Sequence, residues 1–146
     1  MEPTNESELI TRYLLPAFQA LFDDDKRKTL IRWTATQSVD TKQSSSSSSS
    51  RPDCIISVLK NSYPYKNVGF GEVKSPFESG NHHAVNKDLY RLGLFCKTAI
   101  NDAGLRACLA LHAVGLKPHT FYFGTASEWL LHTDDRGLPS QYASFC

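Results

Sequence analysis

The chain has 146 residues, of which 40% are hydrophobic and 21% charged, and this size and composition fit a single globular domain over residues 1–146. Its formal net charge of +1 does not favour a strong nonspecific DNA binder, although a local basic groove or a bound metal could still supply positive charge. No apolar stretch approaches the roughly 20 residues needed to span a bilayer, and the acidic N-terminus lacks the basic-then-apolar order of a signal peptide. We therefore expect a soluble intracellular protein, nuclear or cytoplasmic.

The first expected element is a helix over residues 6–22, where apolar residues recur at i, i+3, i+4 and i+7 spacing. Asn5 followed by Glu8 fits a capping pattern at its start. Pro16 lies inside this helix, and an interior proline costs about 3 kcal/mol. We therefore expect a kink, or two short helices that meet near Leu15.

Three strands should follow the helix. Residues 29–36 are rich in β-branched and aromatic side chains. Residues 37–51 include seven consecutive serines and predict a flexible surface loop that joins two strands of one domain. The next two strands are expected over 53–59 and 68–74, with a turn-rich connector over 61–67 between them.

The second half of the chain predicts a loop over 75–85, an amphipathic helix over 86–102 and strands over 106–114 and 119–123. Residues 124–146 form a C-terminal extension whose pattern does not distinguish a strand from a helical turn. The expected order is α-β-β-β-α-β-β, a central mixed β-sheet flanked by helices and hence an α/β fold.

Asp53, Glu72 and Lys74 are the most informative residues of the chain, because each lies at an end of an apolar run. A strand sends every second side chain to the same face, so Glu72 and Lys74 project together and Val73 projects to the other side. Two carboxylates and an ammonium at the mouth of a buried sheet are costly to desolvate unless they pair or bind a cation. The pattern suits a hard divalent metal and the hydrolysis of a phosphodiester, in which metal and ammonium stabilise developing negative charge.

Pro52-Asp53, eighteen intervening residues and then Glu72-Val73-Lys74 resemble the signature of the PD-(D/E)xK nuclease superfamily, also called restriction-endonuclease-like. The resemblance covers roughly residues 6–123. In that family the aspartate begins the second core strand and the E-x-K motif lies on the third, with a helix before the sheet and another after the motif.

The resemblance implies metal-dependent phosphodiester hydrolysis on nucleic acid, DNA rather than RNA, with Mg²⁺ as cofactor and Mn²⁺ as a substitute. Asp53 and Glu72 would be the side-chain ligands of the metal, and the Val73 backbone carbonyl a further ligand. Lys74 would position or deprotonate the attacking water, or stabilise the charged transition state. An acidic residue of the first helix completes the site in many relatives, and Glu6 is the better candidate here.

The helix after E-x-K carries phosphate-facing residues in relatives, which implies nucleic-acid contacts for Lys87, Arg91 and Lys97. Lys87 and Arg91 lie one turn apart and should share one face of that helix. Some relatives have a Q-x-x-x-Y signature here, which this sequence lacks.

Ordinary explanations exist for the same residues. Pro52-Asp53 also fits a simple strand-entry turn, and Glu72 with Lys74 also fits the exposed face of an edge strand. Lys87 and Arg91 are the kind of pair that often forms a solvated helix face. The alternative function is therefore a catalytically inactive nuclease-fold module that binds nucleic acid or protein.

The cysteines and one histidine have structural interpretations. None of the four cysteines, Cys54, Cys96, Cys108 and Cys146, forms a C-x-x-C pair, so reduced thiols are expected, buried where the segments are apolar. His112 lies in an apolar run and is expected in the core.

Overall fold

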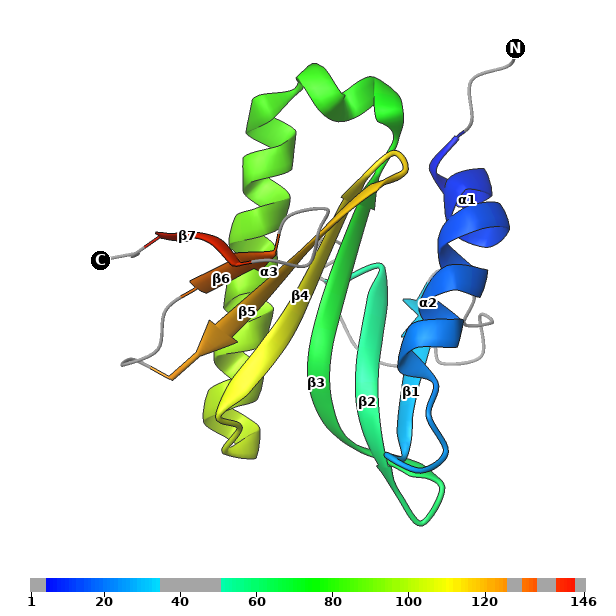
Figure 1. Ribbon diagram of the computed structural model, residues 1–146, viewed down its shortest axis with the longest axis vertical. Coiled ribbons are helices and arrows are strands. Elements are labelled where there is room, and N and C mark those ends of the chain that lie inside the picture. The colour runs from blue at the N-terminus through cyan, green and yellow to red at the C-terminus, as the bar shows by residue number, and fades with distance from the viewer. Residues whose placement is uncertain (1–4, 35–50, 126–129, 134–138, 144–146) are drawn as a thin grey trace, which may run out of the picture.

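The computed structural model describes residues 5–34, 51–125, 130–133 and 139–143, the last two ranges by their backbone alone. They form a seven-stranded mixed sheet in which the strands follow one another in sequence order, with helices on both faces (Figure 1). The expected α/β class, a mixed sheet flanked by helices, is confirmed. Most of the serine-rich segment 37–51 lies outside the described residues.

The N-terminal helical run consists of α1 (Glu6–Leu9), the π-helical η1 (Ile10–Leu14) and α2 (Leu15–Phe22). The Glu8 N–H donates to Asn5 Oδ1 at 2.8 Å, which is the expected cap. The Leu15 N–H donates to the carbonyl of Ile10, five residues earlier, which is the hydrogen bond of a π-helix. Pro16 then falls in the first turn of α2, where its missing N–H leaves no ladder bond unmade. At Leu15 the chain therefore changes from a π-helix to an α-helix without an interruption of the helical run.

Strands β1 (Thr29–Trp33), β2 (Cys54–Lys60) and β3 (Tyr63–Lys74) pair antiparallel in that order. β3 begins five residues earlier than expected, so the predicted connector over 61–67 was wrong. Asn61 and Ser62 have φ of 53° and 66° and form a two-residue turn whose twist matches the flanking strands. β2 and β3 are therefore one long hairpin.

After the 3₁₀ segment η3 (Pro76–Gly80), α3 (His82–Ala103) leads to β4 (Ala107–Val114), which pairs parallel with β3. Asn81 Oδ1 accepts from the Ala84 N–H at 3.1 Å and starts the helix four residues before the expected position. Gly104, with φ of 60°, ends it in the left-handed region.

Strands β5 (Lys117–Gly124), β6 (Leu130–Thr133) and β7 (Pro139–Ala143) extend the sheet antiparallel beyond β4. The last two strands belong to the C-terminal extension over 124–146, whose structure the sequence left open. Among the described residues, no helix combines the length and the apolar character needed to cross a bilayer.

Each face of the sheet has its own core. The N-terminal helices bury Leu9, Leu14 and Phe18 against β1–β4. α3 buries Leu92 and Cys96 against Phe70, Cys108 and Ala110. Cys54, Cys96 and Cys108 are buried and unpaired, as expected for reduced core thiols, whereas Cys146 lies outside the described residues.

Candidate active site

The hairpin brings Asp53, Glu72 and Lys74 to one end of the sheet. Asp53 immediately precedes β2, where its N–H donates to the Gly71 carbonyl at 2.9 Å and its carbonyl accepts from the Thr34 N–H at 2.8 Å. Glu72 and Lys74 end β3 and face α3, while Val73 between them packs into the opposite core. The alternation of a strand therefore separates the charged groups from the hydrocarbon beside them.

Asp53 and Glu72 form a carboxyl pair in which Glu72 is buried and Asp53 is half-buried. Asp53 Oδ2 accepts from the Val73 N–H at 2.7 Å, and the two carboxyl groups are hydrogen-bonded to each other. Burial raises the pKa of both groups, and the neighbouring Asp53 charge helps to raise the pKa of Glu72 to about 8. Both shifts favour the protonated form over the charged one, more strongly for Glu72 than for an exposed glutamate.

Two cations and a third carboxylate surround this pair. Lys74 Nζ lies 3.3 Å from Asp88 Oδ2, and Arg91 Nη2 lies 3.3 Å from Glu72 Oε1. Arg91 Nη1 is 3.7 Å from Asp88 Oδ1, and Nη2 also donates to the Arg51 carbonyl at 3.1 Å. Burial lowers the pKa of Lys74, but the Asp88, Glu6 and Glu72 carboxylates outweigh it, so the net change is upward. Lys74 is therefore a cation at neutral pH.

Asp88 is the residue that sequence reasoning missed. A carboxylate on an amphipathic helix is expected to face solvent, yet the exposed fraction of Asp88 is only 3%. Its position was readable, because Asp88, Leu92 and Cys96 are spaced by four and share one buried face. A carboxylate can be buried there because Lys74 and Arg91 offset its charge.

Several buried acceptor atoms at the site lack an aligned hydrogen bond: Glu72 Oε1, Asp88 Oδ2 and His112 Nε2. The two carboxylate oxygens are within ion-pair distance of Arg91 and Lys74, but without the angles of a hydrogen bond. Such atoms are what a further cation would satisfy.

The donor set fits Mg²⁺ that retains water ligands. Asp53 and Glu72 offer carboxylate oxygens, and the Val73 carbonyl points to the same strand edge as its N–H, which contacts Asp53. Among residues 5–34 and 51–125, no group of three or more His, Cys, Asp or Glu side chains is arranged to hold a metal. Mg²⁺ is commonly held by one or two carboxylates together with water and substrate phosphate, so two suffice.

The remaining predicted site residues have different positions. Glu6 is half-buried at the start of α1, and burial together with the Asp53 charge raises its pKa, which places it within the electrostatic reach of the pair. Lys87 and Lys97 are exposed on α3, whereas Arg91 turns inward to Glu72. Lys87 and Arg91 therefore do not form the common phosphate-facing surface that their spacing predicted.

His112 on β4 lies beside Glu72 in the parallel register. It is buried, as expected for a core histidine, and burial lowers the pKa of its imidazole. The site thus has a neutral polar group on the side away from Asp53.

Comparisons with known proteins add no relative to this geometry. No family model matches the sequence, no curated protein matches it, and no solved structure matches the fold.

Proposed function

We propose that the protein hydrolyses phosphodiester bonds of nucleic acid, DNA rather than RNA, with Mg²⁺ held by Asp53 and Glu72. The single observation that carries this proposal is the hydrogen-bonded pair of carboxyl groups of Asp53 and Glu72, with Lys74 two residues further along the strand of Glu72. The arrangement is similar to the PD-(D/E)xK site, and the element order α-β-β-β-α-β-β of its core is compatible with that fold.

The chain's own groups have distinct roles in this proposal. Asp53 and Glu72 would hold the divalent cation as carboxylates, so a proton held by Glu72 would be released when the metal binds. Bound Mg²⁺ would lower the pKa of a coordinated water and offset charge on the phosphate. The Lys74 ammonium, held by Asp88, stabilises the extra negative charge of the transition state. The Val73 N–H fixes the orientation of Asp53, so the carboxylate does not rotate away.

A second candidate is a nuclease-like module without catalysis. It is favoured by one observation, which is that Arg91 Nη2 already lies 3.3 Å from Glu72 Oε1. A guanidinium in this position can replace a metal as the cation that stabilises the carboxylate. The two candidates differ in whether Mg²⁺ binds.

The first experiment incubates supercoiled plasmid, single-stranded DNA and RNA with purified protein and millimolar Mg²⁺. Lys74→Ala and Asp53→Asn should each reduce cleavage by a factor on the order of 100 or more, because each removes a group that acts on transition-state charge. Lys26→Ala, at an exposed lysine of the turn between α2 and β1, is the matched control and should retain activity. Cleavage that survives both site substitutions refutes the proposal.

The second experiment measures thermal unfolding with and without Mg²⁺. Wild-type protein should melt at higher temperature with the metal, because a ligand that binds only the folded state stabilises it. Asp53→Asn should remove this increase. A wild-type protein that neither cleaves nor responds to Mg²⁺, but binds nucleic acid, supports the second candidate.

A further inference from the structure

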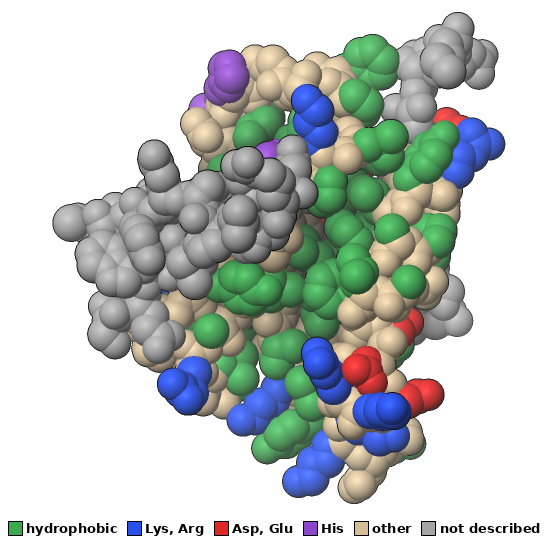
Figure 2. Space-filling model, viewed as in Figure 1, with side chains coloured by type: hydrophobic (Ala, Val, Ile, Leu, Met, Phe, Trp, Pro, Cys, Tyr) green, Lys and Arg blue, Asp and Glu red, His purple; other side chains and the backbone are tan. Residues whose placement is uncertain are grey.

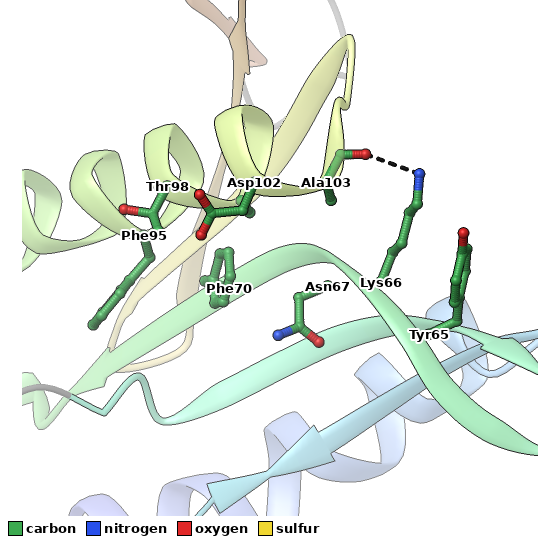
Figure 3. A pocket seen from close by; sticks show the side chains of 9 residues that line it. Tyr65, Lys66, Asn67, Phe70, Phe95, Thr98, Asp102 and Ala103 are labelled. Atoms are coloured by element: carbon green, nitrogen blue, oxygen red, sulfur yellow. Dashed lines mark hydrogen bonds between the residues drawn. The ribbon is translucent and has the colours of Figure 1, made fainter.

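A cavity of about 370 Å³ lies between the C-terminal half of α3 and the first half of β3. Figure 3 shows the rings of Phe70 and Phe95 side by side at one end of it, with Tyr65 at the other. Thr98 and Asp102 line it from the helix. Its size is that of a small-molecule site, and three of the nine residues that line it are aromatic.

A chain of contacts joins this cavity to the carboxyl pair. Arg91, the ion-pair partner of Glu72, lies over the Phe95 ring at 6.0 Å from its centroid. The Phe95 and Phe70 ring centroids are 5.6 Å apart, and both rings line the cavity. On α3, residues 88, 91, 95, 98 and 102 are spaced by three or four and form one stripe, which runs from the site to the cavity.

The outer rim of the cavity is aromatic and basic. The side chain of Tyr65 is 58% exposed, and Lys60 Nζ and Lys66 Nζ lie 5.1 and 5.4 Å from its ring centroid. Lys66 Nζ also donates to the Ala103 carbonyl at 2.8 Å, at the end of α3. Lys and Arg side chains gather at this end of the molecule, around the β2–β3 hairpin (Figure 2). Asp102 is the one acidic side chain that lines the cavity.

We propose that the cavity and its rim bind a nucleotide of single-stranded nucleic acid several positions away from the scissile phosphate. Exposed rings stack on bases whose faces are free, which a duplex does not offer, and the two ammoniums suit the adjacent phosphates. The Asp102 carboxylate can accept from the amino group of a base. The placement relative to cleavage rests on the proposed function, whereas the binding itself does not.

The spacing fixes the length of strand involved. Arg91 and Asp102 are eleven positions apart on one helix, which corresponds to roughly 16 Å. At about 3.4 Å per stacked nucleotide, some five nucleotides separate the carboxyl pair from the cavity. Oligonucleotides shorter than about five nucleotides cannot contact both the carboxyl pair and the cavity. Affinity should therefore increase in a step between lengths of about 4 and 8 nucleotides.

The test measures fluorescence anisotropy of labelled oligothymidylate and oligouridylate of about 4, 8 and 12 nucleotides, with full-length protein in EDTA to prevent cleavage. Tyr65→Ala should weaken binding of the longer strands by roughly five- to 100-fold and abolish the length step. Tyr65→Phe keeps the ring and should bind within about twofold of wild type. Tyr90→Ala, an equally exposed tyrosine of α3, is the matched control.

A second pair of variants tests the cavity itself. Thr98→Glu places a carboxylate in the cavity from an exposed position, so the fold should tolerate it, and should weaken binding at least about fivefold. Asn101→Glu adds the same charge at an exposed neighbouring position outside the cavity and should have little effect. Binding that is unchanged in both Tyr65→Ala and Thr98→Glu, or that prefers blunt duplex, overturns the inference.

The outcome is separable from that of the proposed function. Mg²⁺-dependent cleavage, together with single-strand affinity that is unchanged in Tyr65→Ala and Thr98→Glu, would refute the cavity inference and leave the nuclease proposal intact. Single-strand binding that depends on Tyr65 and Thr98, without cleavage, would support the inference and refute the nuclease proposal.

Discussion

The two faces of the sheet differ in what they bury. Under the N-terminal helices the core is almost entirely hydrocarbon, from Leu9 and Leu14 to Trp33. Under α3 the apolar core stops near Phe70, and beyond it Glu72 and Asp88 are both 3% exposed. Consecutive residues of β3 contribute to both faces, so the difference reflects side-chain identity and not position in the fold.

The α3 face is the less stable arrangement of the two. A buried charged group costs several kcal/mol in desolvation, and a well-packed hydrophobic replacement is often neutral or stabilising. Oxygens without aligned hydrogen bonds increase this cost. We infer that the face is specialised for a ligand, because residues that lower stability without helping to fold the chain are typical of functional sites. Four substitutions test this comparison.

The largest expected effect is on the apolar face. Leu9→Ala removes a fully buried side chain and should destabilise the protein by about 2–5 kcal/mol, since the helix and sheet cannot close the cavity completely. The cleavage activity per folded molecule, measured well below the melting temperature, should stay close to that of wild type. Denaturant unfolding gives the stability. Loss of activity in a folded Leu9→Ala protein would show that the two faces are not separate.

Glu72→Gln should have the opposite effect on stability. The pKa of Glu72 is raised from 4.5 to about 8, so its contribution to stability is fully present below pH 4.5 and is lost as the pH rises toward 8. In metal-free buffer the variant should be up to about 4 kcal/mol more stable than wild type near pH 8 and nearly equal to it near pH 4.5.

Unfolding at both pH values with EDTA measures this difference, and a cleavage assay in parallel should find the variant inactive. A Glu72→Gln protein that is less stable than wild type near pH 8 would mean that the carboxylate is a net stabilising group through Arg91.

A substitution at Gly71 of β3 should have a smaller effect on the stability of the apolar face. A Cβ at Gly71 would collide with the Cys54 sulfur, whereas a Cβ at Gly80 would meet nothing. Gly71→Ala should therefore cost about 1–3 kcal/mol, and Gly80→Ala should cost less than about 0.5 kcal/mol. Thermal unfolding compares the two. Equal stability would show that β2 and β3 can separate without loss.

The sequence predicted the part of this comparison that depends on local pattern. Strand alternation placed Glu72 and Lys74 on one face and Val73 on the other, and both helical regions were predicted, although residues 10–14 within the first are π-helical. It did not predict the partners, because the orientation of Arg91 depends on how α3 crosses the sheet.

Two errors have identifiable physical causes. Asp88 was not among the expected site residues because a carboxylate in an amphipathic helix usually faces solvent, and only the neighbouring cations explain its burial. The connector predicted over 61–67 was too long, because the turn consists of Asn61 and Ser62 alone and neither residue is the glycine typical of such a short turn. In both cases tertiary contacts or strand twist overrode a local preference.

The smallest expected effect comes from His112, the neighbour of Glu72 in the sheet. Burial lowers the pKa of its imidazole from 6.5, so the unfolded chain binds the proton more readily and the folded state loses stability as the pH falls below 6.5. One proton changes stability by at most about 1.4 kcal/mol per pH unit, so the loss is less than about 2 kcal/mol between pH 6.5 and about pH 5.

Glu72 and His112 therefore act with opposite signs. The stability of metal-free wild type should fall on the acidic side through His112 and on the alkaline side through Glu72, with the maximum between these two limbs of the pH profile. His112→Gln should flatten only the acidic limb, while Glu72→Gln flattens only the alkaline one, as unfolding free energies across the pH range would show. An acidic limb that persists in His112→Gln would assign it to other groups and would remove His112 from the polar environment of the carboxyl pair.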